Sequence, residues 1–211
     1  MKKTELNAQS FIKSYWNYFL ELEQHVVQTQ KYVDFDNKNN STFSIEYLKL
    51  LQAICSEVDV VSKAIAQYCN PAFKIDNTTN INKWGLDIQS AFPKIQLEKA
   101  LFSDDYVLEP WINWEYEKYK DKNNNNRIRL KHGRKNPIWW TAYNKVKHER
   151  TSLMSGNRTN YTRANLKNVL LALSGLFILE NIFIDYICEK EKTQISKKHS
   201  SLFRLQTQNT N

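Results

Sequence analysis

The feature that most constrains this sequence is a long apolar segment near its C-terminal end. Between Leu166 and Ile187, apolar side chains fall on most sides of a helix rather than on one stripe. A helix that is apolar all round has to be buried by other parts of the fold. Its most apolar run, Val169–Leu179, is far shorter than the roughly 20 residues that span a bilayer. Residues 161–190 are therefore predicted to form the central helix of a bundle, with no membrane contact.

Further helices are indicated by apolar residues at helical spacing. Ser44 is a suitable N-cap for one of them, and Asn70–Pro71 is expected to end it. Pro137 suits the first position of another helix. The helices are expected over residues 7–32, 45–69, 79–91 and 137–153.

The predicted fold class is all-α, because four Gly and four Pro in 211 residues argue against a turn-rich β sandwich. We expect an up-and-down bundle of about five or six helices in one domain, residues 1–190. Residues 71–136 are expected to be an irregular insertion. Within it, 108–119 is read as a short helix or a packed loop, and the polar run 120–126 as an exposed tip. The polar, basic tail 191–211 is expected to fray.

The formal charge of +8 suits contact with nucleic acid or with an acidic partner. Basic residues are concentrated in 127–150 and in 190–204. The first residues, MKKTELNAQSF, lack the apolar run of a signal peptide, and the three cysteines have no CxxC spacing. A cytoplasmic protein with reduced thiols, no metal site and no cofactor is expected. The sequence has no glycine-rich phosphate loop, HExxH, GxSxG or zinc-finger spacing, which argues against ATP hydrolysis, zinc peptidase chemistry and serine hydrolysis.

One segment combines residues that carry chemistry, namely PIWWTAYNKVKHER at 137–150. On a helix, Trp140, Asn144 and His148 lie at i, i+4 and i+8 and share a face. Lys147 and Arg150 add two cations near that face. An amide, an imidazole and two cations are therefore expected to converge there.

A carboxylate is the expected partner of this cluster. Glu57 lies on the edge of the apolar stripe of helix 45–69. Because a buried carboxylate needs a partner, we expect Glu57 to orient His148 or Arg150 if the two helices pack together.

The order of elements and the phrases ICSEVDVV (54–61) and WWTAYNKVKHER (139–150) resemble the HEPN superfamily of small helical bundles. The motif of that superfamily is an Arg, usually followed by a polar residue, with four to six residues before a His. Asn144 and His148 match it, whereas the Arg position holds Tyr143. A second string with this spacing, Arg127 to His132, is expected to lie in a loop.

The resemblance implies a metal-independent ribonuclease that acts as a homodimer in a bacterial defence or toxin–antitoxin system, with an antitoxin or another protein as a possible partner. It implies a catalytic group of Tyr143, Asn144 and His148, with His148 as general acid or base. Lys145, Lys147 and Arg150 are then expected to hold RNA phosphates.

Two readings compete with catalysis. The pair Asn144 and His148 can be a polar network that ties helix ends together, and Trp139 and Trp140 can be core residues rather than base-stacking groups. Tyrosine carries no charge at neutral pH, so Tyr143 favours a catalytically inactive bundle that binds a protein or a ligand. The exposure of His148 separates these readings, because a nuclease needs it accessible and a structural network buries it.

Overall fold

A computed structural model describes residues 6–103, 106–154 and 156–206. Its helical segments are α1 (Ala8–Phe11), a π-helical turn η1 (Ile12–Trp16), α2 (Asn17–Thr29), α3 (Ile45–Cys69), α4 (Ile81–Ala91), α5 (Ile138–Glu149) and α6 (Leu166–Glu191), with short 3₁₀ turns η2 (Asn37–Asn39), η3 (Ile95–Leu97) and η4 (Asn160–Arg163). The strands are β1 (Ala100–Ser103), β2 (Tyr106–Leu108), β3 (Tyr116–Lys120), β4 (Asn126–Leu130) and β5 (Arg204–Leu205).

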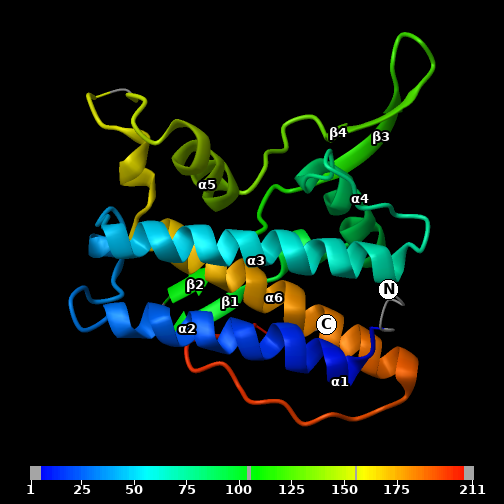
Figure 1. The fold of residues 1–211 in the computed structure, drawn as a ribbon, viewed down its shortest axis with the longest axis horizontal. Helices are drawn as coiled ribbons and strands as arrows, with labels where there is room; N and C mark the ends of the chain where they lie inside the picture. Colours follow the sequence, from blue (N-terminus) through cyan, green and yellow to red (C-terminus); the bar gives the residue numbers. More distant parts are fainter. Residues whose placement is uncertain (1–5, 104–105, 155, 207–211) are drawn as a thin grey trace.

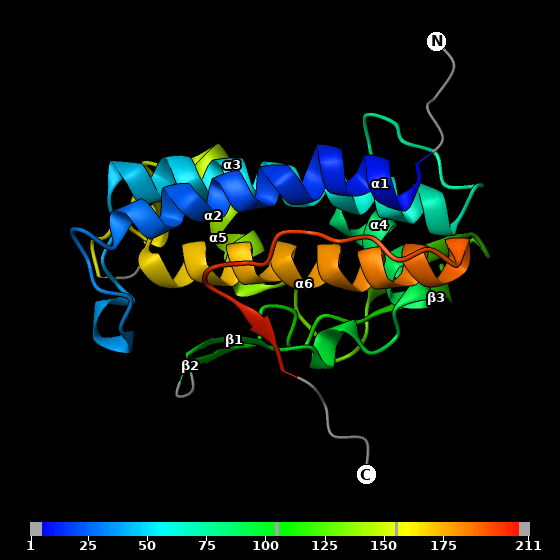
Figure 2. The same ribbon diagram turned by 90° about the horizontal axis from the view of Figure 1, so that it is seen from below.

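Helix α6 is the centre of the molecule. The layer formed by α1, α2 and α3 covers one side of it, and the sheet of β1, β2 and β5 lies on the other side (Figure 2). By length and composition α6 could cross a membrane, but 83% of its most apolar window is buried inside the fold. That burial is typical of the core helix of a soluble protein, as the sequence predicted for this segment.

The neighbouring helices α3 and α6 run parallel, which an up-and-down bundle does not allow. Their N-terminal ends meet where Phe43 and Asn165 form a β-bridge. Their C-terminal ends meet where the rings of Tyr68 and Phe183 pack edge to face, with centroids 5.2 Å apart. The segment between α3 and α6 therefore carries the chain back along the bundle. Its α4, α5 and β3–β4 hairpin lie beside α3 (Figure 1), whereas its β1 and β2 lie on the other side of α6 (Figure 2).

The all-α prediction is wrong, because this return segment contains strands. Strand β1 pairs with β2 and with β5, and β3 pairs with β4, all antiparallel. The segment 108–119 holds no helix: it ends β2, passes through a loop that buries Trp111 and Trp114, and begins β3. The polar tip 120–126 is the exposed turn of the β3–β4 hairpin. Asn124 has φ 63° there, so an asparagine makes a turn that usually needs glycine.

The hairpin is fixed to α4 by one glutamine. The buried side chain of Gln89 donates to the carbonyl oxygen of Trp114 at 2.9 Å and accepts from the backbone N–H of Tyr116 at 2.8 Å. Gly85, one turn earlier, lets the rings of Trp114 and Tyr116 approach the helix, since a Cβ there would come within 2.7 Å of both. The insertion is therefore packed against the bundle and is not irregular.

The C-terminal segment does not fray within the described residues. Residues 193–206, which we call the strap, run back along α6 and end in β5 (Figure 2). The indole N–H of Trp16 donates to the carbonyl oxygen of Lys198 at 2.8 Å. Arg204 and Leu205 pair with Leu101 and Ala100 of β1. A polar composition predicted a free tail, but its backbone and side chains find partners on α1–α2, α6 and the sheet.

Candidate nucleic-acid interface

Helix α5 carries the sequence motif and is held by one apolar face. Pro137 precedes its first residue, and the buried side chains all lie on the side facing the bundle. They are Trp139, Trp140, Ala142, Tyr143 and Val146. The two tryptophans are therefore core residues, as the packing reading expected, and they are not available to stack on bases.

A cluster of indole rings sets the position of α5. Trp139 donates from its indole N–H to the carbonyl oxygen of Pro110 at 2.9 Å, and Trp111 donates to that of Gly175 on α6 at 3.1 Å. Trp111 and Trp139 pack edge to face, with ring centroids 5.2 Å apart. Trp84 on α4 packs in the same way against Trp140. Because these rings are rigid and buried, the outer face of α5 is presented in a fixed orientation.

The last turn of α5 brings the predicted cations and the imidazole to the surface. Lys147, His148 and Arg150 are exposed, and His148 and Arg150 have no side-chain hydrogen bond or ion pair among the described residues. The C-terminal end of a helix carries partial negative charge, which favours basic groups at this position. The sequence left open whether His148 is exposed or enclosed in a structural network. In the structure this side chain is exposed.

The other motif residues are placed less favourably for chemistry. Tyr143 is 8% exposed, and the ammonium group of Lys147 lies 5.3 Å from its ring centroid. Asn144 donates from Nδ2 to the carbonyl oxygen of Trp140 at 2.9 Å, within its own helix. Lys145 forms an ion pair with Glu149 at 2.8 Å. The positive charge of the missing arginine is therefore not supplied by Tyr143, and Lys147 is the cation that lies above it.

Two aromatic side chains lie next to this end of α5, and sequence reasoning missed them. The backbone N–H of Tyr161 donates to the carbonyl oxygen of Arg150 at 3.0 Å. The ring of Tyr161 packs edge to face against Phe43, with centroids 5.4 Å apart, and Phe43 is 46% exposed. Phe43 directly precedes the N-cap Ser44, so the sequence suggested only local packing on α3. We call Lys147, His148, Arg150, Phe43 and Tyr161 the α5 terminal cluster.

Glu57 lies in another part of the molecule. Burial raises the pKa of this carboxyl group, and its charge in turn raises the pKa of Tyr15 on η1 and of Glu180 on α6. No charge of His148 or Arg150 contributes to the pKa of Glu57. Glu57 therefore faces the side of α3 toward η1 and α6, and the structure does not bring it to the α5 terminal cluster.

The second candidate string lies on the hairpin. Arg127 donates from Nε to Asp121 at 3.0 Å, and His132 is exposed in the turn after β4. Arg129 and Arg134 are paired with Glu117 and Glu115. The basic run of this segment is thus largely neutralised by acidic residues of β3 and its flanks. In the described ranges, no group of three or more His, Cys, Asp or Glu side chains is placed to hold a metal ion.

The comparisons with known proteins add no relative. No protein-family model, no curated protein and no solved structure matches this chain. The fold and the site define a helical domain with two small antiparallel sheets that presents a basic and aromatic cluster at the end of α5.

Proposed function

We propose that this protein binds single-stranded RNA at the α5 terminal cluster and that His148 is the residue able to cleave it. The observation that carries the proposal is an exposed imidazole at the C-terminal end of α5, where two exposed cations, Lys147 and Arg150, also lie, with no ion pair on His148 or Arg150 among the described residues. Unpaired cations attract phosphates, and exposed aromatic rings stack on unpaired bases. Lys147 and Arg150 take the phosphates, and the exposed ring of Phe43 is the stacking group, held in place by the partly buried ring of Tyr161.

His148 fits the role of general base. Its imidazole would accept the proton of a ribose 2′-hydroxyl group while that oxygen attacks the adjacent phosphorus, and Lys147 and Arg150 would stabilise the charge that develops on the phosphate. The bond to the 5′-oxygen then breaks, and that oxygen takes up a proton. Such cleavage needs a second proton donor, which a second copy of the chain would supply in the homodimer that the HEPN resemblance implies. A cytoplasmic role in defence or toxin–antitoxin function rests on the same resemblance.

A second candidate is RNA binding without cleavage. It is favoured by the burial of Tyr143 at the position where the motif has arginine. In that case the α5 terminal cluster serves as a binding surface only, and the protein acts as an inactive module of the same architecture.

The binding test is the salt dependence of affinity for a labelled single-stranded RNA, measured by fluorescence anisotropy. For single strands, each phosphate contact contributes about 0.7 to the slope of log affinity against log salt concentration. The double substitution K147E/R150E is expected to reduce that slope by about 1.4. Lys74→Glu changes an exposed lysine after α3 and serves as the control with unchanged slope. An equal effect of Lys74→Glu would mean that only net charge matters and would refute the site.

Cleavage is tested separately on an RNA pool without added metal. His148→Ala is expected to abolish cleavage while leaving RNA affinity within about twofold, since the two cations remain. Binding without cleavage by the wild-type protein selects the inactive module. Undiminished cleavage by His148→Ala would show that His148 is not the base.

A further inference from the structure

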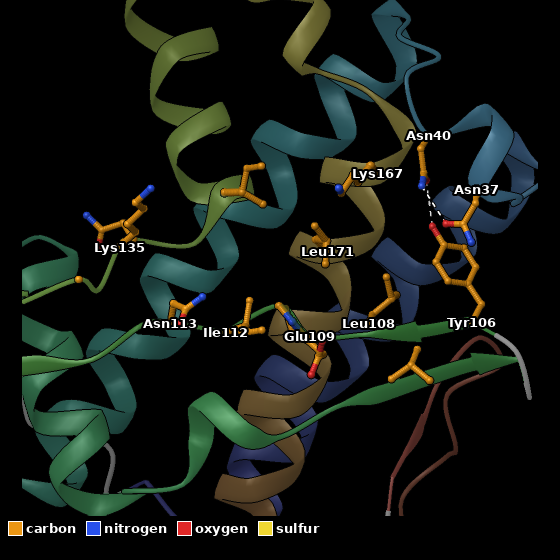
Figure 3. A pocket seen from close by; sticks show the side chains of 15 residues that line it. Asn37, Asn40, Tyr106, Leu108, Glu109, Ile112, Asn113, Lys135, Lys167 and Leu171 are labelled. Atoms are coloured by element: carbon orange, nitrogen blue, oxygen red, sulfur yellow. Dashed lines mark hydrogen bonds between the residues drawn. The ribbon is translucent and has the colours of Figure 1, made fainter. Parts of the chain in front are cut away.

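The structure contains a second candidate site, at the opposite end of α5. A cleft of about 640 Å³ lies between the loop before α5, the loop after β2, the first turns of α6 and the η2 turn (Figure 3). We call it the amide cleft. Its volume lies in the range of about 300–1,000 Å³ that is usual for small-molecule sites.

The amide cleft carries two uncompensated positive charges. Lys135 and Lys167 line it from two different elements, and both are exposed, without an ion pair among the described residues. The one acidic residue in the lining, Glu109, is paired with Lys99 at 2.8 Å. Because Lys99 outside the lining neutralises Glu109, the charges of Lys135 and Lys167 stay unpaired, and this favours an anion.

The side-chain amides of the cleft present donors rather than acceptors. The Oδ1 of Asn113 accepts from the guanidinium group of Arg134 at 3.1 Å, and the Oδ1 of Asn37 accepts from Asn40 at 3.0 Å. In each residue the Nδ2 group makes no hydrogen bond within the described ranges. Because arginine can only donate, the orientation of the Asn113 amide is fixed. Two amide groups and two ammonium groups thus offer donors to a ligand rich in acceptor oxygens.

Asn113 also has an unusual backbone. Its φ is 62°, in the left-handed region that few residues other than glycine adopt, and its carbonyl oxygen accepts from the backbone N–H of Lys135 at 3.0 Å. The arrangement places the Asn113 amide and Lys135 side by side on one wall of the cleft (Figure 3).

The remaining part of the cleft is apolar and exposed. Ile112 is 50% exposed and Ile138 is 57% exposed, and both line the cleft. Leu108 and Leu171 lie beneath them as buried residues. A simple inorganic anion would leave these side chains in water, whereas a ligand with an apolar body would cover them.

We infer that the amide cleft binds a small organic anion, with a phosphate or carboxylate group held by Lys135 and the Asn113 amide and an apolar body against Ile112 and Ile138. Lys167 and the Asn37 amide lie further along the cleft and add positive charge and donors there (Figure 3). This site is separate from the α5 terminal cluster and does not depend on RNA binding. A phosphate and a carboxylate both offer negative charge and acceptor oxygens, and the experiment distinguishes a ligand with one from a ligand with the other.

The test is calorimetric titration of the full-length protein with phenyl phosphate, benzoate, inorganic phosphate and benzyl alcohol. Phenyl phosphate or benzoate is expected to bind, and to bind more tightly than either inorganic phosphate or the neutral alcohol. Lys135→Glu is expected to weaken binding about tenfold or more, because it removes a charge-assisted contact. Lys167→Glu is expected to weaken binding by a smaller factor, because it reverses a charge further along the cleft. Lys74→Glu is the matched control on an exposed lysine outside the cleft.

One variant and its control test the contribution of the apolar part of the amide cleft. Ile138→Ser is expected to weaken binding of the phenyl ligand several-fold without changing the binding of inorganic phosphate, and Ile75→Ser, an equally exposed isoleucine elsewhere, is the control. K147E/R150E leaves this binding unchanged, which keeps it distinct from the RNA site. Failure of both phenyl anions to bind at millimolar concentration overturns the inference. So does binding no tighter than that of inorganic phosphate, or equal sensitivity to Lys74→Glu and Lys167→Glu.

Discussion

The carboxylate of Glu23 on α2 accepts hydrogen bonds from both the backbone N–H and the hydroxyl group of Ser201, at 2.7 and 2.8 Å. It also accepts from the hydroxyl group of Ser200 and from the backbone N–H of Leu202. Glu23 is fully buried. The buried carboxylate of Glu23 is stabilised by hydrogen-bond donors of the strap instead of by water. Glu23 therefore holds the strap against α2.

Glu23→Ala is expected to detach the strap and to lower the free energy of unfolding by about 3 kcal/mol, because buried donors lose a charged acceptor. Hydrogen–deuterium exchange should show faster exchange over residues 200–205. Glu21→Ala, on the exposed face of the same helix, is the control with little change. Retained protection of residues 200–205 in Glu23→Ala would contradict the anchoring role.

Glu180 on α6 predicts a pH dependence of stability. Burial raises the pKa of this carboxyl group well above its ordinary value of 4.5, the charge of Glu57 raises it further, and the charge of Lys197 opposes the shift. Neither carboxyl oxygen of Glu180 has a hydrogen-bond partner in the part of the chain that the structure describes. The folded protein therefore holds a proton that the unfolded chain releases above pH 4.5. The contribution is fully present below that pH and is lost as the pH rises through the folded pKa.

Glu180→Gln removes this titration, because the amide is neutral at every pH. The variant should match the wild type below pH 4.5 and exceed its stability at neutral pH by about 1–3 kcal/mol. Chemical denaturation at a series of pH values measures the difference. A constant difference across that range would show that Glu180 does not titrate as a buried acid.

Gly85→Ala should destabilise the protein although alanine is the better helix former. The added Cβ would lie 2.6 Å from Cε2 of Tyr116 and 2.7 Å from Cζ2 of Trp114. Displacing two packed rings costs about 1–3 kcal/mol, which exceeds the gain in helix propensity of about 1 kcal/mol. Thermal unfolding followed by circular dichroism gives the sign, and an increase in Tm would show that the hairpin is not packed on α4 as described.

Asp121 orders the hairpin turn in a pH-dependent way. Hydrogen bonds lower the pKa of this carboxyl group to about 2, and the largest contribution comes from the backbone N–H of Asn125, followed by the side chain of Arg127. A lowered pKa gives a contribution that is present above the ordinary value of 3.8 and is lost as the pH falls through about 2. In an NMR titration, the amide shifts of Asn123 and Asn125 should have midpoints near 2. Midpoints at 3.8 would exclude these contacts in solution.

The sequence alone predicted the helices whose ends carry capping or helix-ending residues. Helix α3 begins after Ser44, whose side chain accepts from the backbone N–H of Tyr47 at 3.0 Å, and it ends before Pro71 as expected. The strands lacked such signals. Half of the residues of β3 and β4 are charged, and cross-strand ion pairs such as Arg129 with Glu117 contribute to the pairing of the two strands. The low number of glycines also favoured the wrong all-α prediction. Asparagines replace glycine in turns here, because they adopt the left-handed conformation at 113, 124 and 157.

The spacing of α5 predicted which residues share one helix face, but it left the exposure of His148 open, and only the structure shows this side chain exposed. The position of Glu57 does not follow from spacing either, because the edge of an apolar stripe has two sides, and tertiary packing turned this residue toward Tyr15 and Glu180. Phe43 joins the cluster only through a bridge between segments distant in the chain. Contacts between segments distant in the chain leave no periodic pattern in the sequence, so they could not be predicted from it.

The parallel pairing of α3 and α6 has a consequence for biosynthesis. The core helix is made after α1, α2 and α3, so these helices leave the ribosome before the surface that buries their apolar stripe exists. Until α6 arrives and the loop of residues 70–165 closes, the nascent protein exposes most of its future core. We expect this domain to fold only after α6 has left the ribosome, with transient dependence on chaperones, and we expect chains interrupted before residue 166 to aggregate.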